Sequence, residues 1–313
     1  MRTATTPAGN MTRMTSLDIL RLFSALAVLF FHYLYRGAQT DKSFLATGYP
    51  ELAEYGIYGS YGVTLFFIIS GFVISWSAEG RSFAQFAIAR FARLYPGYLA
   101  CMTLTCLFIL GFGMAPFETG LANYLANLTM VAPAFGQPFM DGVYWTIIME
   151  VIFYGWVALA VLSGVFGRWK FELAAGWLVL CIANQVYVES GLLKFVFITN
   201  YGPYFIAGVL LQHMLARGVK LEAVLLFAAC FLQSFQPLFA GQQGMLALYG
   251  SALSDGQIYA TNTAVFVLAL AAIAVRDHIP PSPWLIALGG LTYPLYLLHH
   301  NAGFVALNHL SPV

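Results

Sequence analysis

The sequence predicts an all-α, polytopic transmembrane helical bundle with about nine to ten spans. Three observations support this fold class. The 313 residues are 60% hydrophobic and only 9% charged, whereas about 25% of residues are charged in a typical soluble domain. The mean hydropathy is +0.76. Apolar runs of roughly 20 residues, the length that crosses a bilayer as a helix, recur along the whole chain.

The apolar runs can be placed to within a few residues. Those long enough to span a membrane lie at about 17–36, 61–78, 94–113, 143–166, 172–189, 195–216, 221–240, 259–276 and 284–309. Residues 121–133 are too short and polar to span and are expected to be interfacial or re-entrant, and 244–254 could be a similar piece. Residues 1–16 are expected to form a flexible cytoplasmic segment, and residues 17–313 a single transmembrane domain.

Loop charge predicts the orientation, because Lys and Arg favour the cytoplasmic side of a membrane. Alternate loops carry all of the basic residues except Arg36, Lys42 and Lys194. We therefore expect a multi-pass protein of the bacterial inner membrane with a cytoplasmic amino terminus. Nine spans would place the carboxyl terminus outside, and a tenth would reverse only that end.

The composition also excludes some partners. The net charge is only +1 and the basic residues are scattered, which argues against a nucleic-acid partner. All four cysteines lie inside apolar runs, and no spacing of cysteine or histidine indicates a metal site. Membrane lipids are the partners that the composition requires, while the oligomeric state stays open.

The first span carries two ionisable side chains on one line. Arg21 and His32 are eleven residues apart, so on a helix they lie within about 20° of one face and about 16 Å apart along the axis. Ionisable groups inside membrane helices are costly and usually functional. The alternative is an anchoring arginine and a histidine that only satisfies a neighbour.

Three further ionisable residues fall deep in predicted spans. The predicted orientation places Glu150 in the outer half of its span, as it does His32, and His299 and His300 at mid-membrane or slightly beyond. A carboxylate next to an imidazole can orient it and raise its basicity, so we expect Glu150 to pair with His32. Adjacent helical residues point about 100° apart, so only one of the two later histidines should face this pair. A purely structural His–Glu pair is the alternative.

A basic segment precedes the third span. In FAIARFARLYPGY, Arg90 and Arg93 are three residues apart and share a helix face, and Pro96 is expected to begin the next helix. With Arg21 at the same membrane surface, these arginines could bind phosphates through forked, charge-assisted hydrogen bonds. They could equally anchor the chain to lipid headgroups.

Other polar and aromatic residues are weaker candidates for substrate contact. Ser70 in GVTLFFIISGFVIS could bind a substrate, although close helix packing is its ordinary role. Tyr144 and Trp145 suit either a carbohydrate acceptor or an aromatic belt at the membrane interface. His299 in LTYPLYLLHH, near the end of the chain, is a further candidate.

Five segments in order resemble the integral-membrane acyltransferase family 3, whose bacterial members acylate sugars. LDILRLFSALAVLFFHY resembles the family's LDGLRAIAALxVVxFH, including the Arg-x10-His spacing carried by Arg21 and His32. GVTLFFIISGFVIS resembles GVDLFFVLSGFLI, with Thr64 where the family commonly has Asp. FAIARFARLYPGY, VYWTIIMEVIFY and LTYPLYLLHH resemble three later elements. The resemblance extends from Leu17 to about Asn301.

The resemblance implies an acyl-CoA donor, acetyl-CoA or another, that enters from the cytoplasm, and an acceptor hydroxyl on a glycan or lipid-linked sugar. It implies that His32 is the general base, that Glu150 orients it, and that Arg21, Arg90 and Arg93 bind the CoA phosphates. No metal is implied. Thr64 differs from the Asp that is common in the family, and this difference puts in doubt only a role for that position.

A different class of function fits the same buried groups. In a transporter or flippase for a lipid-linked sugar, His32, Glu150 and His299 would form a proton relay. Inverted internal repeats would favour that reading, and the sequence contains none that we find. A purely structural scaffold is disfavoured by several ionisable groups at one expected depth.

Overall fold

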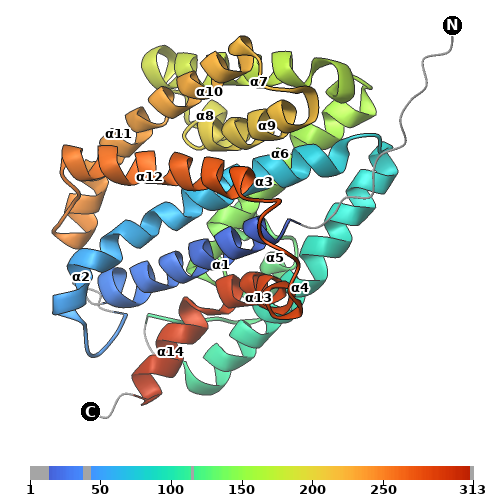
Figure 1. Cartoon of the computed structure of the whole chain (residues 1–313). Helices are drawn as coiled ribbons and strands as arrows, with labels where there is room; N and C mark the ends of the chain where they lie inside the picture. Colours follow the sequence, from blue (N-terminus) through green and yellow to red (C-terminus); the bar gives the residue numbers. More distant parts are fainter. Residues whose placement is uncertain (1–13, 38–43, 114–115, 311–313) are drawn as a thin grey trace, which may run out of the picture.

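The computed structural model describes residues 14–37, 44–113 and 116–310. These residues form helices and connecting turns without a strand (Figure 1). The helices are α1 (Thr15–Phe30), the π-helix η1 (Phe31–Arg36), α2 (Pro50–Gly56), α3 (Gly62–Ala78), α4 (Phe83–Phe112), α5 (Leu121–Asn127), α6 (Trp145–Leu162), α7 (Phe166–Ala183), α8 (Gly191–Val196), α9 (Gly202–Arg217), α10 (Leu221–Gln233), α11 (Phe235–Tyr249), α12 (Asp255–Ala274), α13 (Pro283–Leu298) and α14 (Asn301–Leu310). The predicted all-α fold is confirmed.

Seven helical stretches within the described ranges are long and apolar enough to cross a membrane. Three predicted spans are divided between two helices, and one of them, 221–240, is interrupted only at Ser234 between α10 and α11. The run 195–216 is divided between α8 and α9, because Gly202 and Pro203 start a new helix there. The run 284–309 is divided into α13 and α14, which are separated by His299 and His300.

The two short segments left open by the sequence, 121–133 and 244–254, are helical in part. Residues 121–127 form the two-turn helix α5, and residues 244–249 are the last part of α11. Of the segment 1–16 that was expected to be flexible, residues 1–13 lie outside the described residues. Helix α1 already begins at Thr15, inside this segment.

Helix α4 is one continuous helix, so the expectation that Pro96 begins a new one is wrong. Pro96 lacks the N–H that would bond the carbonyl four residues earlier, and membrane helices tolerate this where neighbours satisfy the backbone. Tyr293 of α13 donates its hydroxyl to the carbonyl of Leu94 at 3.1 Å. A ring from another helix therefore supports α4 next to its proline.

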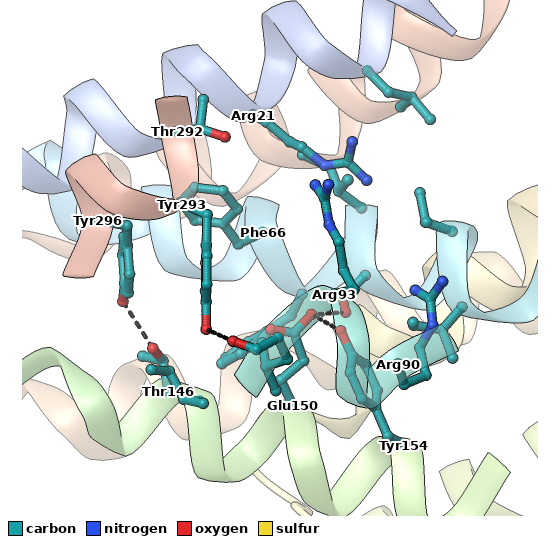
Figure 2. A pocket seen from close by; sticks show the side chains of 18 of the residues that line it. Arg21, Phe66, Arg90, Arg93, Thr146, Glu150, Tyr154, Thr292, Tyr293 and Tyr296 are labelled. Atoms are coloured by element: carbon teal, nitrogen blue, oxygen red, sulfur yellow. Dashed lines mark hydrogen bonds between the residues drawn. The ribbon is translucent and has the colours of Figure 1, made fainter. Parts of the chain in front are cut away.

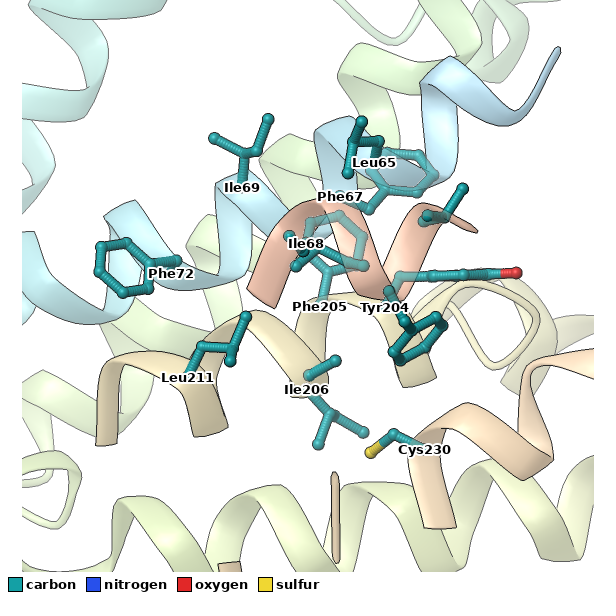
Figure 3. Close-up of a cluster of buried hydrophobic side chains, with 14 of the residues drawn as sticks. Leu65, Phe67, Ile68, Ile69, Phe72, Tyr204, Phe205, Ile206, Leu211 and Cys230 are labelled. Atoms are coloured by element: carbon teal, nitrogen blue, oxygen red, sulfur yellow. The ribbon is translucent and has the colours of Figure 1, made fainter. Parts of the chain in front are cut away.

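The centre of the fold is the contact between α3 and α9, where apolar side chains from both helices interlock (Figure 3). Phe67 and Phe205 stack with ring centroids 4.6 Å apart. The helix backbones can approach because Gly71 and Gly208 have no side chain: a Cβ on Gly71 would lie 2.1 Å from the carbonyl oxygen of Phe205, and one on Gly208 would lie 2.0 Å from that of Ile68. Small residues at helix crossings commonly allow such contact in membrane proteins.

Replacing Gly208 with alanine is expected to destabilise the protein by about 1–3 kcal/mol, because the new methyl group collides with backbone that cannot move independently. Thermal unfolding of the detergent-purified protein would show the loss as a lower Tm. Gly176→Ala on α7 is the matched control, since a Cβ there meets no atom within 4 Å. Equal Tm values for the two variants would contradict the role of the close crossing.

Candidate active site

A cavity of about 450 Å³ lies between α1, α3, α4, α6 and α13. Ligand sites for small molecules commonly have volumes of about 300–1,000 Å³. Figure 2 shows three guanidinium groups toward one end, the pair Tyr296–Thr146 at the other, and Glu150 with Tyr293 between them. The cavity therefore has a cationic end and an aromatic end.

The three arginines selected from the sequence all line this cavity. Arg21 comes from α1, and Arg90 and Arg93 come from one face of α4 before Pro96. Arg21 forms an ion pair with Asp18, one turn earlier, at 3.2 Å. The Nε of Arg90 is buried and has no hydrogen-bond partner among the described residues. This end of the cavity thus carries more positive charge than its own carboxylates neutralise.

Glu150 lies on the wall of the same cavity and not against His32. Its Oε1 accepts hydrogen bonds from the hydroxyls of Ser70, at 2.6 Å, and Tyr154, at 2.5 Å. The expectation that Glu150 pairs with His32 is therefore wrong. The side chain of Glu150 points toward α3, whereas His32 lies in the π-helical turn at the far end of the first span. Ser70, by contrast, does line the cavity.

The aromatic end of the cavity is formed by α13 and α6. Tyr296 shares a hydrogen bond with Thr146, with their hydroxyl oxygens 2.9 Å apart (Figure 2). The ring of Tyr296 also contacts the rings of Phe66 and His299, at centroid distances of 5.4 and 5.6 Å. Tyr296 thus separates the cavity from a group of histidines.

Three histidine rings meet next to Tyr296. Nδ1 of His32 lies 2.8 Å from Nε2 of His299. The ring of His300 lies edge-on to that of His32, with centroids 4.6 Å apart. All three are at most 6% exposed. The expectation that only one of His299 and His300 faces His32 is wrong, because α13 ends at Leu298 and both residues lie in the turn before α14, where helical spacing does not hold.

Asp141 fixes this turn and was not selected from the sequence. One carboxylate oxygen accepts the N–H of Val143 at 3.1 Å, and the other accepts the N–H of Asn301 at 2.8 Å, so one side chain caps two helix starts. Oδ1 also lies 3.6 Å from Nδ1 of His300. Burial raises the pKa of the Asp141 carboxyl to about 7. An Asp directly before an apolar run was the available sequence signal.

Two of the weaker candidates lie away from the cavity. Tyr144 is buried against Tyr98 at a ring-centroid distance of 5.0 Å, and Trp145 packs on Tyr201 at 5.5 Å. Neither lines the arginine cavity. Thr64, where the resemblance leads to an expected Asp, donates its hydroxyl to the carbonyl of Tyr61 at 2.8 Å. The Thr64 hydroxyl is therefore engaged in a hydrogen bond with the backbone of the preceding turn.

The described residues contain no group of three or more His, Cys, Asp or Glu side chains that could hold a metal ion. Within the histidine group, His32 and His299 share a hydrogen bond between their imidazole rings. A site of this kind can bind an anionic ligand at its arginine end and take a proton at its histidine end.

The fold and site define a polytopic, all-helical membrane protein with a buried histidine group beside a cationic cavity. The chain belongs to the acyltransferase 3 family, whose acyltransferase domain matches residues 14–311. This confirms the resemblance to this family found in the sequence.

Two curated relatives are similar to part of the chain. Nodulation protein 10 of Rhizobium leguminosarum bv. viciae is 29% identical over 192 residues, which cover 53% of this chain and 48% of that protein. Acyltransferase MdmB of Streptomyces mycarofaciens is 29% identical over 155 residues, or 45% of this chain and 38% of that protein. The chain thus matches half or less of the length of either relative. No solved structure matches it.

Asp141→Ala is expected to remove two helix caps at once. Each lost cap should lower the free energy of unfolding by about 1–2 kcal/mol, so the Tm should fall. Because the caps hold the turn with His299 and His300, acyl transfer should fall with them. Thermal unfolding and a transfer assay on the purified protein would measure both effects.

Ser254→Ala is the matched control for this substitution. Ser254 caps α12 through Gln257 in a capping box, and α12 does not line the cavity. Ser254→Ala should lower the free energy of unfolding by roughly 1 kcal/mol, and with it the Tm, without reducing transfer. Full transfer by the Asp141 variant would show that the turn does not depend on this carboxylate.

Proposed function

We propose that this acyltransferase moves an acetyl or other short acyl group from acyl-CoA to a hydroxyl of a glycan or lipid-linked sugar. In this proposal His32 is the general base, and Arg21, Arg90 and Arg93 bind the CoA phosphates at the cytoplasmic side. The protein would lie in the bacterial inner membrane with its amino terminus in the cytoplasm, as the loop charges predict.

One arrangement supports the proposal more than any other. A cavity with three arginines at one end is bounded at the other by Tyr296, whose ring contacts His299, which in turn is bonded to His32. Guanidinium groups bind phosphates in fixed, forked geometry. An elongated donor with phosphates at one end and a reactive thioester at the other matches these two ends.

The proposed reaction balances without a metal or redox partner. His32 takes the proton of the acceptor hydroxyl as its oxygen attacks the thioester carbonyl. The new C–O bond forms, the C–S bond breaks, and the thiolate leaves with the electron pair of that bond. The proton on His32 then passes to the thiolate, so the products are an ester and free CoA thiol. General base catalysis of this kind contributes about 10²–10⁴-fold to the rate.

Glu150 has a different part in this proposal from the one expected from the sequence. By accepting both hydroxyls, it holds Ser70 of α3 and Tyr154 of α6 at the wall of the donor cavity. It is therefore a positioning residue for the donor site. The candidates Tyr144 and Trp145 have no assigned contact in the proposed reaction.

Arg21→Ala is expected to weaken acetyl-CoA binding to the purified protein by roughly 10- to 100-fold, the effect of losing one hydrogen bond to a charged group. Isothermal titration calorimetry would measure the change in Kd, and longer acyl-CoAs would be titrated in parallel. Arg168→Ala is the control, since this exposed arginine stacks on Trp169 away from the cavity. Unchanged binding by the Arg21 variant would remove it from the phosphate site, and folded wild type that binds no acyl-CoA would favour the transporter reading.

His32→Ala is expected to abolish acyl transfer while acetyl-CoA still binds with the wild-type Kd, because the proposed phosphate-binding arginines lie at the opposite end of the cavity from Tyr296 and the histidine group. Transfer is measured as release of free CoA thiol in the presence of glycan from the host membrane. Substantial transfer by a correctly folded His32 variant would end the proposed role of this residue.

A further inference from the structure

The histidine group contains a chain of hydrogen bonds that runs from His32 through His299 to the carbonyl of Tyr296. His299 places Nδ1 at 2.8 Å from the carbonyl oxygen of Tyr296 and Nε2 at 2.8 Å from Nδ1 of His32. His299 is 4% exposed and His32 is 6% exposed, so water does not compete freely for these contacts. Each contact has the length of a good hydrogen bond.

The first contact fixes the proton on His299. A carbonyl oxygen can only accept, so Nδ1 of His299 must carry hydrogen and donate it. In the neutral ring, Nε2 of His299 then has the lone pair and accepts. The partner nitrogen, Nδ1 of His32, must therefore carry hydrogen. This leaves the lone pair of neutral His32 on Nε2.

The carbonyl that starts the chain is available because α13 ends there. The last four carbonyls of a helix lack partners within the helix, and histidine side chains near the end can bond them. The N–H of His299 bonds to the carbonyl of Leu295, and the next carbonyl, that of Tyr296, is bonded by the His299 ring. The end of a helix thus sets the tautomer of a histidine on another helix.

We propose that His299 is a positioning residue that holds His32 in the tautomer with its basic lone pair on Nε2. This inference rests on the proposed role of His32 as general base. When Nε2 of His32 takes the hydroxyl proton, the ring becomes an imidazolium whose Nδ1–H still donates to His299. The carbonyl of Tyr296 polarises His299 from its other side. This chain of hydrogen bonds from His32 through His299 to the carbonyl of Tyr296, called the relay below, therefore stabilises the positive charge without a second proton transfer.

The relay also connects the base with the donor cavity. Tyr296 lines the cavity with its side chain and holds His299 with its backbone carbonyl. Its hydroxyl is fixed by Thr146 on α6. One residue therefore sets both the cavity wall and the orientation of the proposed base.

His300 is not part of this relay, although its ring touches His32. Its Nδ1 lies 2.6 Å from Oδ1 of Asn301, and its Nε2 is buried without a hydrogen-bond partner in the described part of the chain. Its ring packs against Phe304 at a centroid distance of 4.9 Å. The relay therefore runs through His299 alone.

The first test is the tautomer itself, measured by ¹⁵N NMR of the full-length protein labelled at histidine, in detergent. The His32 signals are assigned by their loss in His32→Ala. We expect a protonated Nδ1 and an unprotonated Nε2 for His32 in the wild type. The opposite tautomer would overturn the proposal, and this result does not depend on any variant at position 299 folding.

The second test compares His299→Phe, which cannot accept a hydrogen bond, with His299→Gln, whose amide oxygen can. In the thiol-release assay, His299→Phe should lower kcat by roughly 100-fold or more with little change in KM, and His299→Gln should recover at least about tenfold of this loss. Equal kcat values for wild type and His299→Phe would overturn the proposal, as would equal loss in both variants when both fold normally.

His213→Phe is the matched control, because His213 lies on α9 against Phe171, outside the histidine group, and should keep wild-type kcat. The failure of the proposed function is distinguishable from failure of the relay. Activity in His32→Ala contradicts the role of the base, whereas an inactive His32→Ala with a fully active His299→Phe contradicts only the relay.

Discussion

The structure depends on how the polar groups buried in this apolar bundle find partners. A membrane interior offers no water to satisfy an unpaired donor or acceptor, and the cost of leaving one unsatisfied is several kcal/mol. The polar contacts therefore join helices that are far apart in the sequence. Ser70 and Glu150 join α3 to α6, and His32 and His299 join the first span to the end of α13.

These contacts divide the site into two parts. The arginines, Glu150 and Ser70 line the cavity, while His32, His299 and His300 lie behind its aromatic wall. Tyr296 belongs to both parts, and Asp141 holds the turn that carries the histidines. In the proposed reaction, this division would hold the donor by its charged end while proton transfer takes place in a dry, preorganised environment.

Much of this protein could be predicted from its sequence. The helical membrane fold follows from hydropathy, since a run of about 20 apolar residues has few alternatives in a bilayer. The common face of Arg90 and Arg93 follows from helical spacing, and both line the cavity with Arg21. The family follows from five short motifs in order, and residues 14–311 match its acyltransferase domain.

The pairing of the buried groups was decided only by the tertiary structure. Hydropathy gives a residue's expected depth but not the rotation of its helix or its nearest neighbour, so His32 and Glu150 were expected to pair and have different partners. A helix end also cannot be placed to one residue by an apolar run that continues through it. Because α13 ends at Leu298, both later histidines reach His32, and the carbonyl of Tyr296 becomes available to orient one of them.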